Sequence, residues 1–402
     1  MHRRPDREYD MKKIGIITQF HNSINYGGVL QAYALCRAIR EMGYPAEQIR
    51  FIPGAPEEYA VRKPLLYRMM NLFRPAILKD YLSSKAEEAR NASIAAEIAR
   101  RREVFLSFGQ EYIPQSSRAY PAEEIAQTAE AYDCFITGSD QVWNLDWYQG
   151  AYFLDFVPAG KPKLSYAASL GMRNLAEQQQ EKLRQLLTGF TAVSVREEDA
   201  VGLVQSATEL LVECVLDPTM LLSVQQWDEV CSDKQIQEPY LFCYFLGENS
   251  ELRTMAEEYA RRHGLKIVTI PHASGLYTKN DRSFGEEKVW AASPGDFLSL
   301  IRYADCVFTN SFHAAVFSGI YEKQYFVFPR HKGDRMVSRI YTLTGYFGCQ
   351  DHFCDSDEKC TPDYMDNLPR ICYDRQSEAL IRRRERSMAF LERNLPERHI
   401  GE

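Results

Sequence analysis

Short apolar runs alternate with amphipathic stretches along most of this chain, and this alternation limits its fold more than any other feature. The apolar runs lie at residues 12–18, 133–140, 164–171, 192–197, 209–219, 240–247, 266–272 and 305–311. Stretches with helical spacing lie at residues 29–43, 78–110, 175–189, 198–206, 250–263 and 294–303. Strands that alternate with helices in this way form parallel sheets covered by helices on both faces. We therefore predict an α/β fold.

The alternation occurs twice, and the stretch LDPT at 216–219 separates the two series. A chain of 402 residues is long enough for two ordinary α/β domains. The boundaries predicted are a disordered extension at 1–10, a first domain at 11–216 with a charged helical insertion, and a second domain at 217–372. The last residues, 373–402, contain an amphipathic helix.

Charge and hydropathy exclude several classes of protein. The net charge of -7 and the pI near 5.8 argue against a general polyanion binder, so no nucleic-acid partner is expected. No apolar run approaches the roughly 20 residues that span a bilayer, and the opening MHRRPDREYD lacks the apolar centre of a signal peptide. We predict a cytoplasmic protein.

The cysteines predict reduced core residues and no metal site. The chain has ten cysteines and no CxxC pair, and most of the cysteines lie in apolar surroundings. A tighter group near the C-terminus, with a histidine beside it, suggests zinc as an alternative; it comprises Cys349, His352, Cys354, Cys360 and Cys372. The spacings match no common zinc pattern.

Five loops place polar or glycine residues where a predicted strand ends: 21–28, 137–144, 194–199, 216–219 and 309–315. In open parallel sheets, ligands bind outside these strand ends, often with an anionic group at the next helix N-terminus. Each loop alone has a structural alternative, such as a glycine turn at 21–28, a helix cap by Ser139 or Asp140, or a hydrogen-bonded structural histidine at His313. Together the five loops favour a binding site.

Familiar nucleotide and hydrolase motifs are missing from the sequence. No GxGxxG follows a strand and no GxxxxGK[ST] occurs, so neither a Rossmann dinucleotide site nor a P-loop is supported. No GxSxG and no HExxH occur, so neither of those hydrolase classes is indicated.

Six motifs occur in an order that resembles the polysaccharide pyruvyl transferase family: NYGGVLQAYAL, DCFITGSDQVWN, SYAASLG, SVREEDAVGLV, VLDPT and FLSLIRYADCVFTNSFHAAVFSG. The resemblance runs from about Lys12 to the terminal helix. It implies a GT-B-like protein, in which two Rossmann-like domains face each other across a cleft. It also implies that the C-terminal helix, within 373–402, crosses back to pack on the first domain.

The resemblance also implies an activity. Members of this family transfer a pyruvyl group from phosphoenolpyruvate to hydroxyls of a sugar in a cell-surface or exopolysaccharide precursor, forming a pyruvate ketal and releasing phosphate. Phosphoenolpyruvate is then a donor substrate, and no cofactor is needed. The acceptor is a saccharide or a lipid-linked saccharide, through which the protein associates peripherally with a membrane.

The donor carries a phosphate and a carboxylate, so its site needs fixed positive charge and helix-terminus donors. Arg196 lies beside a predicted helix start, and Asn310 and Ser311 begin another helix. Three further arginines follow the histidine motif, at Arg330, Arg335 and Arg339; of these we assign Arg335 to the donor. His313 is predicted to contact the phosphate and act as the acid, with Asp140 as the base.

The acceptor is assigned to the loops of the first domain. The residues predicted there are Asn25, Gly27, Gly28, Ser139 and Trp143. Trp143, like other aromatic residues near these loops, has a sugar-stacking interpretation and a core interpretation.

The chain departs from the family at one position. Many members have an arginine two residues before the histidine, where this chain has Ser311. A hydroxyl cannot replace a bidentate guanidinium contact, so either a downstream arginine such as Arg335 binds the anion or the donor is bound differently. Two alternatives stay open: a GT-B-type glycosyltransferase that uses a nucleotide-sugar donor, and a non-catalytic glycan-binding protein.

Overall fold

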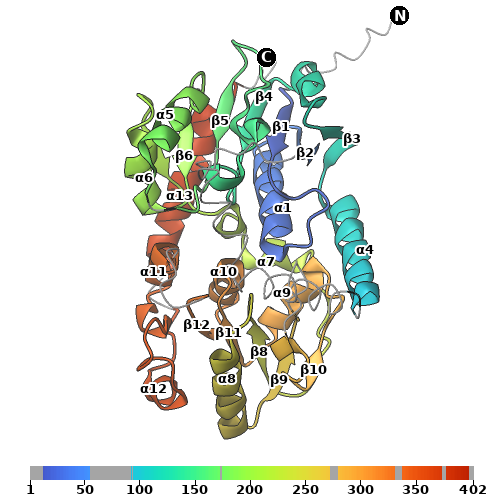
Figure 1. Cartoon of the computed structure of the whole chain (residues 1–402), viewed down its shortest axis with the longest axis vertical. Helices are drawn as coiled ribbons and strands as arrows, with labels where there is room; N and C mark the ends of the chain where they lie inside the picture. The colour runs from blue at the N-terminus through green and yellow to red at the C-terminus, as the bar shows by residue number, and fades with distance from the viewer. Residues whose placement is uncertain are drawn as a thin grey trace, which may run out of the picture.

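The computed structural model describes residues 12–54, 92, 94–172, 174–271, 279–330, 337–373 and 377–397 (Figure 1). The predicted N-terminal extension, part of the predicted helical insertion and Arg335 lie outside these ranges. Within them, two α/β units are arranged one above the other along the long axis of the molecule (Figure 1).

The first domain is built on a parallel sheet with strand order β3-β2-β1-β4-β5. Its strands are β1 (Ile14–Ile17), β2 (Ala46–Ile52), β3 (Gln115–Pro121), β4 (Cys134–Thr137) and β5 (Lys163–Ser165). A further parallel pair, β6 (Val193–Val195) and β7 (Val212–Cys214), continues the sheet through bridges from Leu164 to Ala192 and from Ala168 to Val195.

The second domain repeats this strand order, as β10-β9-β8-β11-β12, with every pair parallel. Its strands are β8 (Tyr240–Tyr244), β9 (Lys266–Thr269), β10 (Glu287–Lys288), β11 (Cys306–Thr309) and β12 (Gln324–Val327). In each domain the first strand lies between the second and the fourth, which creates a topological switch point where the chain order reverses. The predicted pair of Rossmann-like domains is confirmed.

Helices cover both sheets, and several of them lie between the two domains (Figure 1). Those described are α1 (Tyr26–Glu41), α4 (Ala95–Tyr112), α5 (Glu177–Leu186), α6 (Glu198–Gln205), α7 (Val224–Asp228), α8 (Ser250–His263), α9 (Pro294–Arg302), α10 (Phe312–Ile320), α11 (Val337–Tyr346), α12 (Pro362–Asn367) and α13 (Ser377–Asn394). Side-chain caps set where the central ones begin: Asn25 caps α1, Ser293 caps α9 and Ser311 caps α10. The helices therefore start at the carboxyl edges of the sheets, where the loops face the other domain.

The contact between the domains is apolar and rich in aromatic rings. Tyr26 of α1 stacks on Phe297 of α9 with ring centroids 4.5 Å apart, and its hydroxyl donates to the carbonyl of Ala292. Trp227 of α7 packs between Tyr33 of the first domain and Phe317 of the second. One buried cluster of apolar side chains is thus continuous across both domains, as expected of an interface that fixes two domains together.

The last helix returns to the first domain, as predicted. Phe390 and Leu391 of α13 are buried in the shared core. The Ser387 hydroxyl accepts a hydrogen bond from the backbone N–H of Leu216, and the Tyr44 hydroxyl donates to the carbonyl of Pro396. Together with the matching strand orders, this crossing confirms the GT-B-like arrangement.

Two further observations concern metals and membranes. No group of three or more potential metal-binding side chains is found among the described residues. His352 stacks on Phe326 and bonds to backbone carbonyls, and the Cys349 thiol lies 3.0 Å from the hydroxyl of Tyr325. No helix within the described ranges has both the length and the apolar character needed to cross a bilayer.

Candidate functional site

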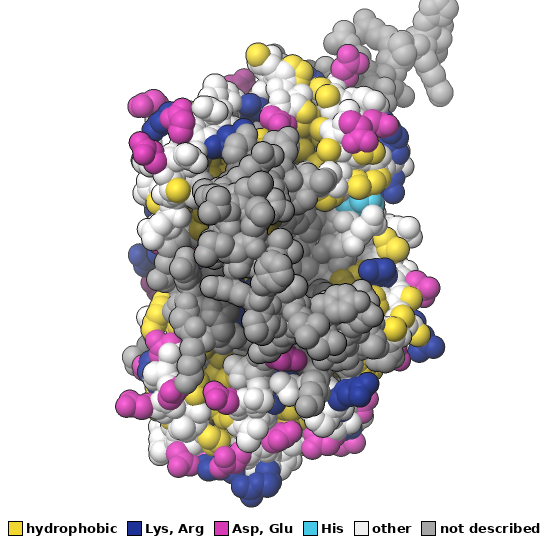
Figure 2. Space-filling model, in the orientation of Figure 1, with side chains coloured by type: hydrophobic (Ala, Val, Ile, Leu, Met, Phe, Trp, Pro, Cys, Tyr) yellow, Lys and Arg dark blue, Asp and Glu magenta, His cyan; other side chains and the backbone are white. Residues whose placement is uncertain are grey.

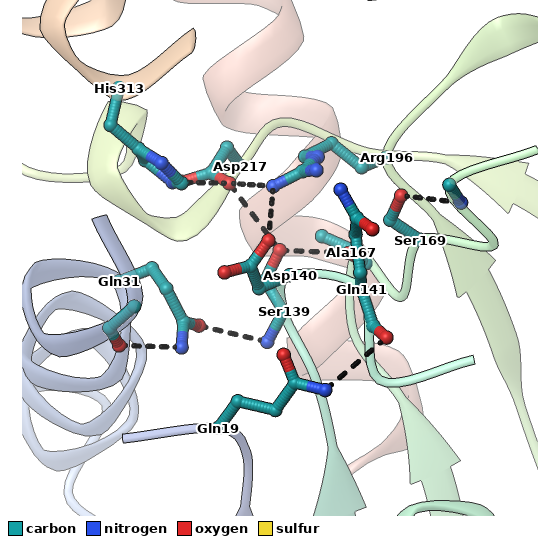
Figure 3. A network of polar contacts seen from close by, with 12 residues as sticks. Gln19, Gln31, Ser139, Asp140, Gln141, Ala167, Ser169, Arg196, Asp217 and His313 are labelled. Atoms are coloured by element: carbon teal, nitrogen blue, oxygen red, sulfur yellow. Dashed lines mark hydrogen bonds and ion pairs between the residues drawn. The ribbon is translucent and has the colours of Figure 1, made fainter. Parts of the chain in front are cut away.

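Asp217 and His313 meet at the contact between the two domains. Asp217 follows β7 and caps the short 3-10 helix Pro218–Met220, while His313 lies in the first turn of α10. Nε2 of His313 is 3.5 Å from Oδ2 of Asp217 (Figure 3). At this distance the contact is electrostatic, and it leaves the buried Nε2 without a well-formed hydrogen bond. Asp217 thus lies at the predicted domain boundary, just after the last strand of the first domain, and His313 belongs to the second domain.

Asp217 is held ionised by its neighbours. Burial alone would raise the pKa of this carboxyl, but the charges of His313 and Arg196 and the hydrogen bonds from Arg196 and Thr219 outweigh burial and hold the pKa well below its usual range. Oδ1 accepts from the backbone N–H and the hydroxyl of Thr219, and Oδ2 accepts from Nη1 of Arg196 at 3.0 Å. A fixed, ionised carboxylate thus faces the imidazole of His313.

The positive charge of Arg196 is almost fully compensated by nearby acidic side chains. Besides Asp217, its guanidinium contacts Glu197 at 3.0 Å and lies 3.8 Å from Asp140. Burial would lower its pKa, but these carboxylates outweigh burial and raise the pKa above the usual value. Only Nη2 remains without a hydrogen-bond partner. Arg196 therefore holds three carboxylates in place. Figure 3 shows two of them, Asp140 and Asp217.

The loop after β4 brings Asp140 to the same place. The φ of Gly138 is +117°, and a Cβ there would lie 2.1 Å from the carbonyl oxygen of Tyr166, so this position requires glycine. Asp140 itself has φ of +67°, in the left-handed region that few non-glycine residues adopt. Such conformations cluster at functional sites. Ser139 donates through its hydroxyl to the carbonyl of Ala167, while its backbone N–H donates to Oε1 of Gln31.

Gly27 makes the close approach of the domains possible. A Cβ built on Gly27 would lie 1.9 Å from Nδ1 of His313. Any larger residue at the start of α1 would therefore collide with the imidazole. The predicted loop residue Gly27 and the predicted acid His313 are thus neighbours across the two domains.

Arg339 of α11 completes the cluster from the second domain. Its guanidinium lies over the Phe312 ring at 5.6 Å, and the guanidinium of Arg196 lies over the same ring at 4.7 Å. Arg339 is only 8% exposed. Among the described residues, no carboxylate forms an ion pair with it, and its Nε has no hydrogen-bond partner. Burial and the nearby charges of Arg330 and Arg196 lower the pKa of Arg339 to about 9.

Several predicted site residues have local structural roles instead. The Asn310 amide is occupied at both ends, because it accepts from the N–H and donates to the carbonyl of Leu246. Ser311 and Asn25 accept hydrogen bonds from the first turns of α10 and α1. Trp143 is fully buried, stacks on Phe153 and donates to the carbonyl of Tyr152.

One of these predictions is corrected and one stays a prediction. The Asn310 amide joins the ends of β11 and β8 through one accepted and one donated hydrogen bond, which leaves a second N–H and a second lone pair, so its assignment to the donor stays a prediction. The Trp143 side chain cannot stack on a sugar because it is part of the core of the first domain. Ser311 and Asn25 set helix starts and so position their neighbours. Gly28 approaches the loop after β1, since a Cβ there would lie 3.0 Å from the carbonyl oxygen of Gln19.

Three residues of this cluster were not assigned from the sequence: Asp217, Glu197 and Arg339. Asp217 lies in the LDPT loop, where an aspartate before a proline is typical of a helix cap. The sequence pattern therefore predicts a cap and gives no sign of the contacts with Arg196 and His313. Glu197 follows Arg196 directly and resembles an ordinary acidic helix start. Arg339 is one of several arginines in its segment, and its burial is evident only from the structure.

The cavity within this cluster is small in the present arrangement. It measures about 10 Å³ and is lined by Arg196, Asp217, Phe312 and Arg339, among others. This volume suits about one water molecule.

Comparison with known proteins gives one family. The family model for polysaccharide pyruvyl transferase matches residues 25–332. No curated protein matches the chain. A solved UDP-GlcNAc 2-epimerase from Methanocaldococcus jannaschii, in complex with UDP-GlcNAc and UDP, is similar with a TM-score of 0.50 and 12% identity, covering 95% of this chain and 99% of that one.

Two further solved structures are less similar. A UDP-N-acetylglucosamine 2-epimerase from Rickettsia bellii has a TM-score of 0.46 and 11% identity, covering 96% of this chain and 99% of that one. The ADP-heptose lps heptosyltransferase II from E. coli has a TM-score of 0.37 and 11% identity, covering 92% and 99%.

Proposed function

Because the chain belongs to the polysaccharide pyruvyl transferase family and is therefore a transferase, we propose that it transfers a pyruvyl group from phosphoenolpyruvate to two hydroxyls of a saccharide. The product is a cyclic pyruvate ketal, and inorganic phosphate is released. Two C–O bonds form at C2 of the donor and the C2–O bond to phosphate breaks. C3 gains a proton, the phosphate leaves with the other hydroxyl proton, and no metal or redox cofactor is needed for this balance.

The observation that carries the proposal is the uncompensated charge of Arg339. A buried guanidinium without an ion pair among the described residues, beside a second arginine, is unfavourable until an anion arrives. Phosphoenolpyruvate offers a phosphate and a carboxylate, both of which match the planar fork of a guanidinium. Arg339 then supplies the contact that Ser311 cannot make.

The proton transfers are assigned to His313 and Asp140. His313 donates to the developing product, and Asp217, which faces its Nε2, stabilises the imidazolium before the transfer. Asp140 accepts the proton of an attacking hydroxyl from the first domain. Asp217 is thus a positioning residue, while His313 and Asp140 are the proposed acid and base.

Binding of the donor tests the assignment without knowledge of the acceptor. We expect phosphoenolpyruvate at a hundred times its dissociation constant to stabilise the protein by about 2.7 kcal/mol. Arg339→Met should abolish this response and yet leave the ligand-free protein as stable or more stable, because it removes an uncompensated buried charge. A purely structural Arg339 would give the opposite, a less stable protein that still binds the donor. A response to UDP-GlcNAc alone would instead favour a nucleotide-sugar donor.

Catalysis can be tested with phosphoenolpyruvate and a panel of methyl glycosides, measuring phosphate release. Once one glycoside is active, His313→Gln and Asp140→Asn should each reduce turnover by about 10²-fold or more, since this is the range for positioned acids and bases. Full activity of either variant would remove that residue from the mechanism. The acceptor in the cell is then sought among saccharides and lipid-linked saccharides.

A further inference from the structure

Another cavity has a described lining that belongs to the first domain and includes no residue of the cluster of Asp217 and His313. It measures about 370 Å³ and lies between the loop after β1 and one face of α4. The loop contributes Phe20, His21, Asn22, Ser23 and Ile24; the remaining lining residues are Val29, Arg50, Arg102, Phe105, Leu106, Gly109, Gln110 and Gln115. A volume of this size accommodates a small-molecule ligand.

The described lining of this cavity is basic and contains no acidic side chain. Arg50 and Arg102 form no ion pair with any described carboxylate, and the buried Nε of Arg50 has no hydrogen-bond partner. His21 is kept neutral, because burial and the charge of Arg50 both lower its pKa. In a chain with a net charge of -7, an acid-free cavity with two arginines is selective for an anion.

One wall of the cavity is apolar. Phe20, Phe105 and Leu106 line it, beside the polar groups of Asn22 and Gln110. Phe20 and Phe105 are largely buried, and Leu106, which is 46% exposed, presents apolar surface to the cavity. An apolar surface next to amide groups suits a saccharide, whose C–H groups pack on apolar side chains while its hydroxyls form hydrogen bonds. The cavity therefore combines features for a sugar and for an anion.

The cavity is joined to the proposed reaction site by a short stretch of chain. The loop that lines it leads directly to Asn25, Tyr26 and Gly27, and Gly27 contacts His313. Tyr26 packs against Phe105 of α4 with ring centroids 4.8 Å apart. Arg339 and His313, which are assigned to the donor, belong to the second domain, whereas every described lining residue of the cavity belongs to the first.

We propose that this cavity binds the phosphate-bearing end of the acceptor, a saccharide linked to a phosphate or diphosphate, with Arg50 and Arg102 as counter-charges. The inference rests on the proposed function, since it assigns the acceptor of that reaction. A sugar diphosphate can come from a nucleotide or from a lipid carrier, and both sources share the group recognised here.

The test measures binding by calorimetry with three probes: inorganic pyrophosphate, UDP-GlcNAc and N-acetylglucosamine linked by diphosphate to a short prenyl chain. We expect at least one sugar diphosphate to bind more tightly than pyrophosphate. The sugar diphosphate that binds more tightly identifies whether the natural ligand is linked to a nucleotide or to a lipid carrier. If neither sugar diphosphate binds, the proposal is wrong.

Variants assign the binding to this cavity. Arg50→Gln combined with Arg102→Gln should lower the affinity for the tighter-binding probe at least tenfold. Arg100 is an exposed residue of α4 outside the cavity, and Arg100→Gln should change this affinity less than twofold. Gly109→Leu provides a second variant, because a Cβ at Gly109 meets nothing within 4 Å and a leucine there fills the cavity without removing a charge. This variant should also lower the affinity for the probe.

Phosphoenolpyruvate binding distinguishes this proposal from the donor assignment. The cavity variants should bind phosphoenolpyruvate as the wild type does, and phosphoenolpyruvate should not displace the probe. Displacement would show that the cavity is the donor site and would overturn the proposal. If the probe binds in a way that depends on Arg50 and Arg102 but phosphoenolpyruvate does not bind, the cavity assignment is supported. Only the assignment of phosphoenolpyruvate as the donor is then contradicted.

Discussion

At the start of α1, the missing side chain of Gly27 leaves the space that the His313 imidazole occupies. This contact shows how closely the site depends on single residues of both domains. Asp217 and His313 interact only because α1 comes close enough for the domains to join. Small changes at these positions therefore affect stability and catalysis together.

Gly27→Ala should reduce both activity and stability, since its Cβ would lie 1.9 Å from Nδ1 of His313 and either the imidazole or α1 must shift. Thermal unfolding and phosphate release would measure the two effects. Gly202→Ala is the matched control: Gly202 lies in α6, and a Cβ at this position would meet nothing within 4 Å. That change should stabilise the helix by about 0.5–1 kcal/mol. Equal behaviour of the two variants would contradict the proposed collision.

Asp217 should make the protein sensitive to acid. Its folded-state pKa is depressed below the unfolded value of about 4, so its ionised form stabilises the fold above about pH 5, and this contribution is lost as the pH falls through the folded pKa. Asp217→Asn should be less stable at pH 7 by about 3–5 kcal/mol, because it leaves buried Arg196 and His313 without this partner.

Urea unfolding between pH 3 and pH 7 measures this difference. The Asp217→Asn variant should lose less stability on acidification than the wild type. Asp363→Asn, at a side chain that is 79% exposed, should leave the profile unchanged. If the wild type and Asp217→Asn lose stability in parallel, the carboxylate is not the acid-sensitive group.

Among the elements, α13 shows how a distant segment supports the site. It packs on the first domain through Phe390 and Leu391, and Ser387 bonds to the backbone N–H of Leu216, the residue before Asp217. The helix therefore holds the strand end that positions the carboxylate. Its amphipathic pattern is visible in the sequence.

Leu391→Ala should destabilise the protein by about 2–5 kcal/mol, as expected for a large-to-small change in a packed core. It should also expose the C-terminal segment to limited proteolysis. Glu392→Ala, the exposed neighbour, should change neither property. If Leu391→Ala is cleaved no faster than the wild type, α13 is not what protects this end of the chain.

Elements that are uniformly apolar could be predicted from the sequence, while mixed ones could not. The central strands β1, β4, β8 and β11 are fully buried and appear as continuous apolar runs. β2 contains Glu47 and Arg50, and the edge strand β3 reads QSSRAYP, so neither has a clear pattern. The loops at the strand ends were predicted, but the pairing of Asp217 with His313 was not, because it depends on how the domains meet.

On the scale of the whole molecule, the apolar contact around Tyr26 and Trp227 joins the two domains into one core. On the face shown in Figure 2, basic and acidic side chains are interspersed over the described surface, without a continuous basic stripe. The two domains are held together by buried apolar contacts.

The wild type should unfold in a single calorimetric transition, because its core is continuous across both domains. Trp227→Ala should lower stability by about 3–5 kcal/mol and separate the transition into two, since Trp227 contacts Tyr33 of one domain and Phe317 of the other. Trp147→Ala is the control at a tryptophan that is 44% exposed, and it should have little effect. Two transitions in the wild type would show that the domains unfold independently.

The shared strand order has an evolutionary consequence. In the first half the proposed site loops follow β1 and β4, the first and fourth strands of the five-stranded sheet counted along the chain, and in the second half the proposed acid His313 follows β11, again the fourth strand. Under the proposed roles, one half recognises the acceptor and the other the donor. Selection can then alter the loops of one half while the other keeps its chemistry, so a lineage can acquire new acceptors without giving up its donor.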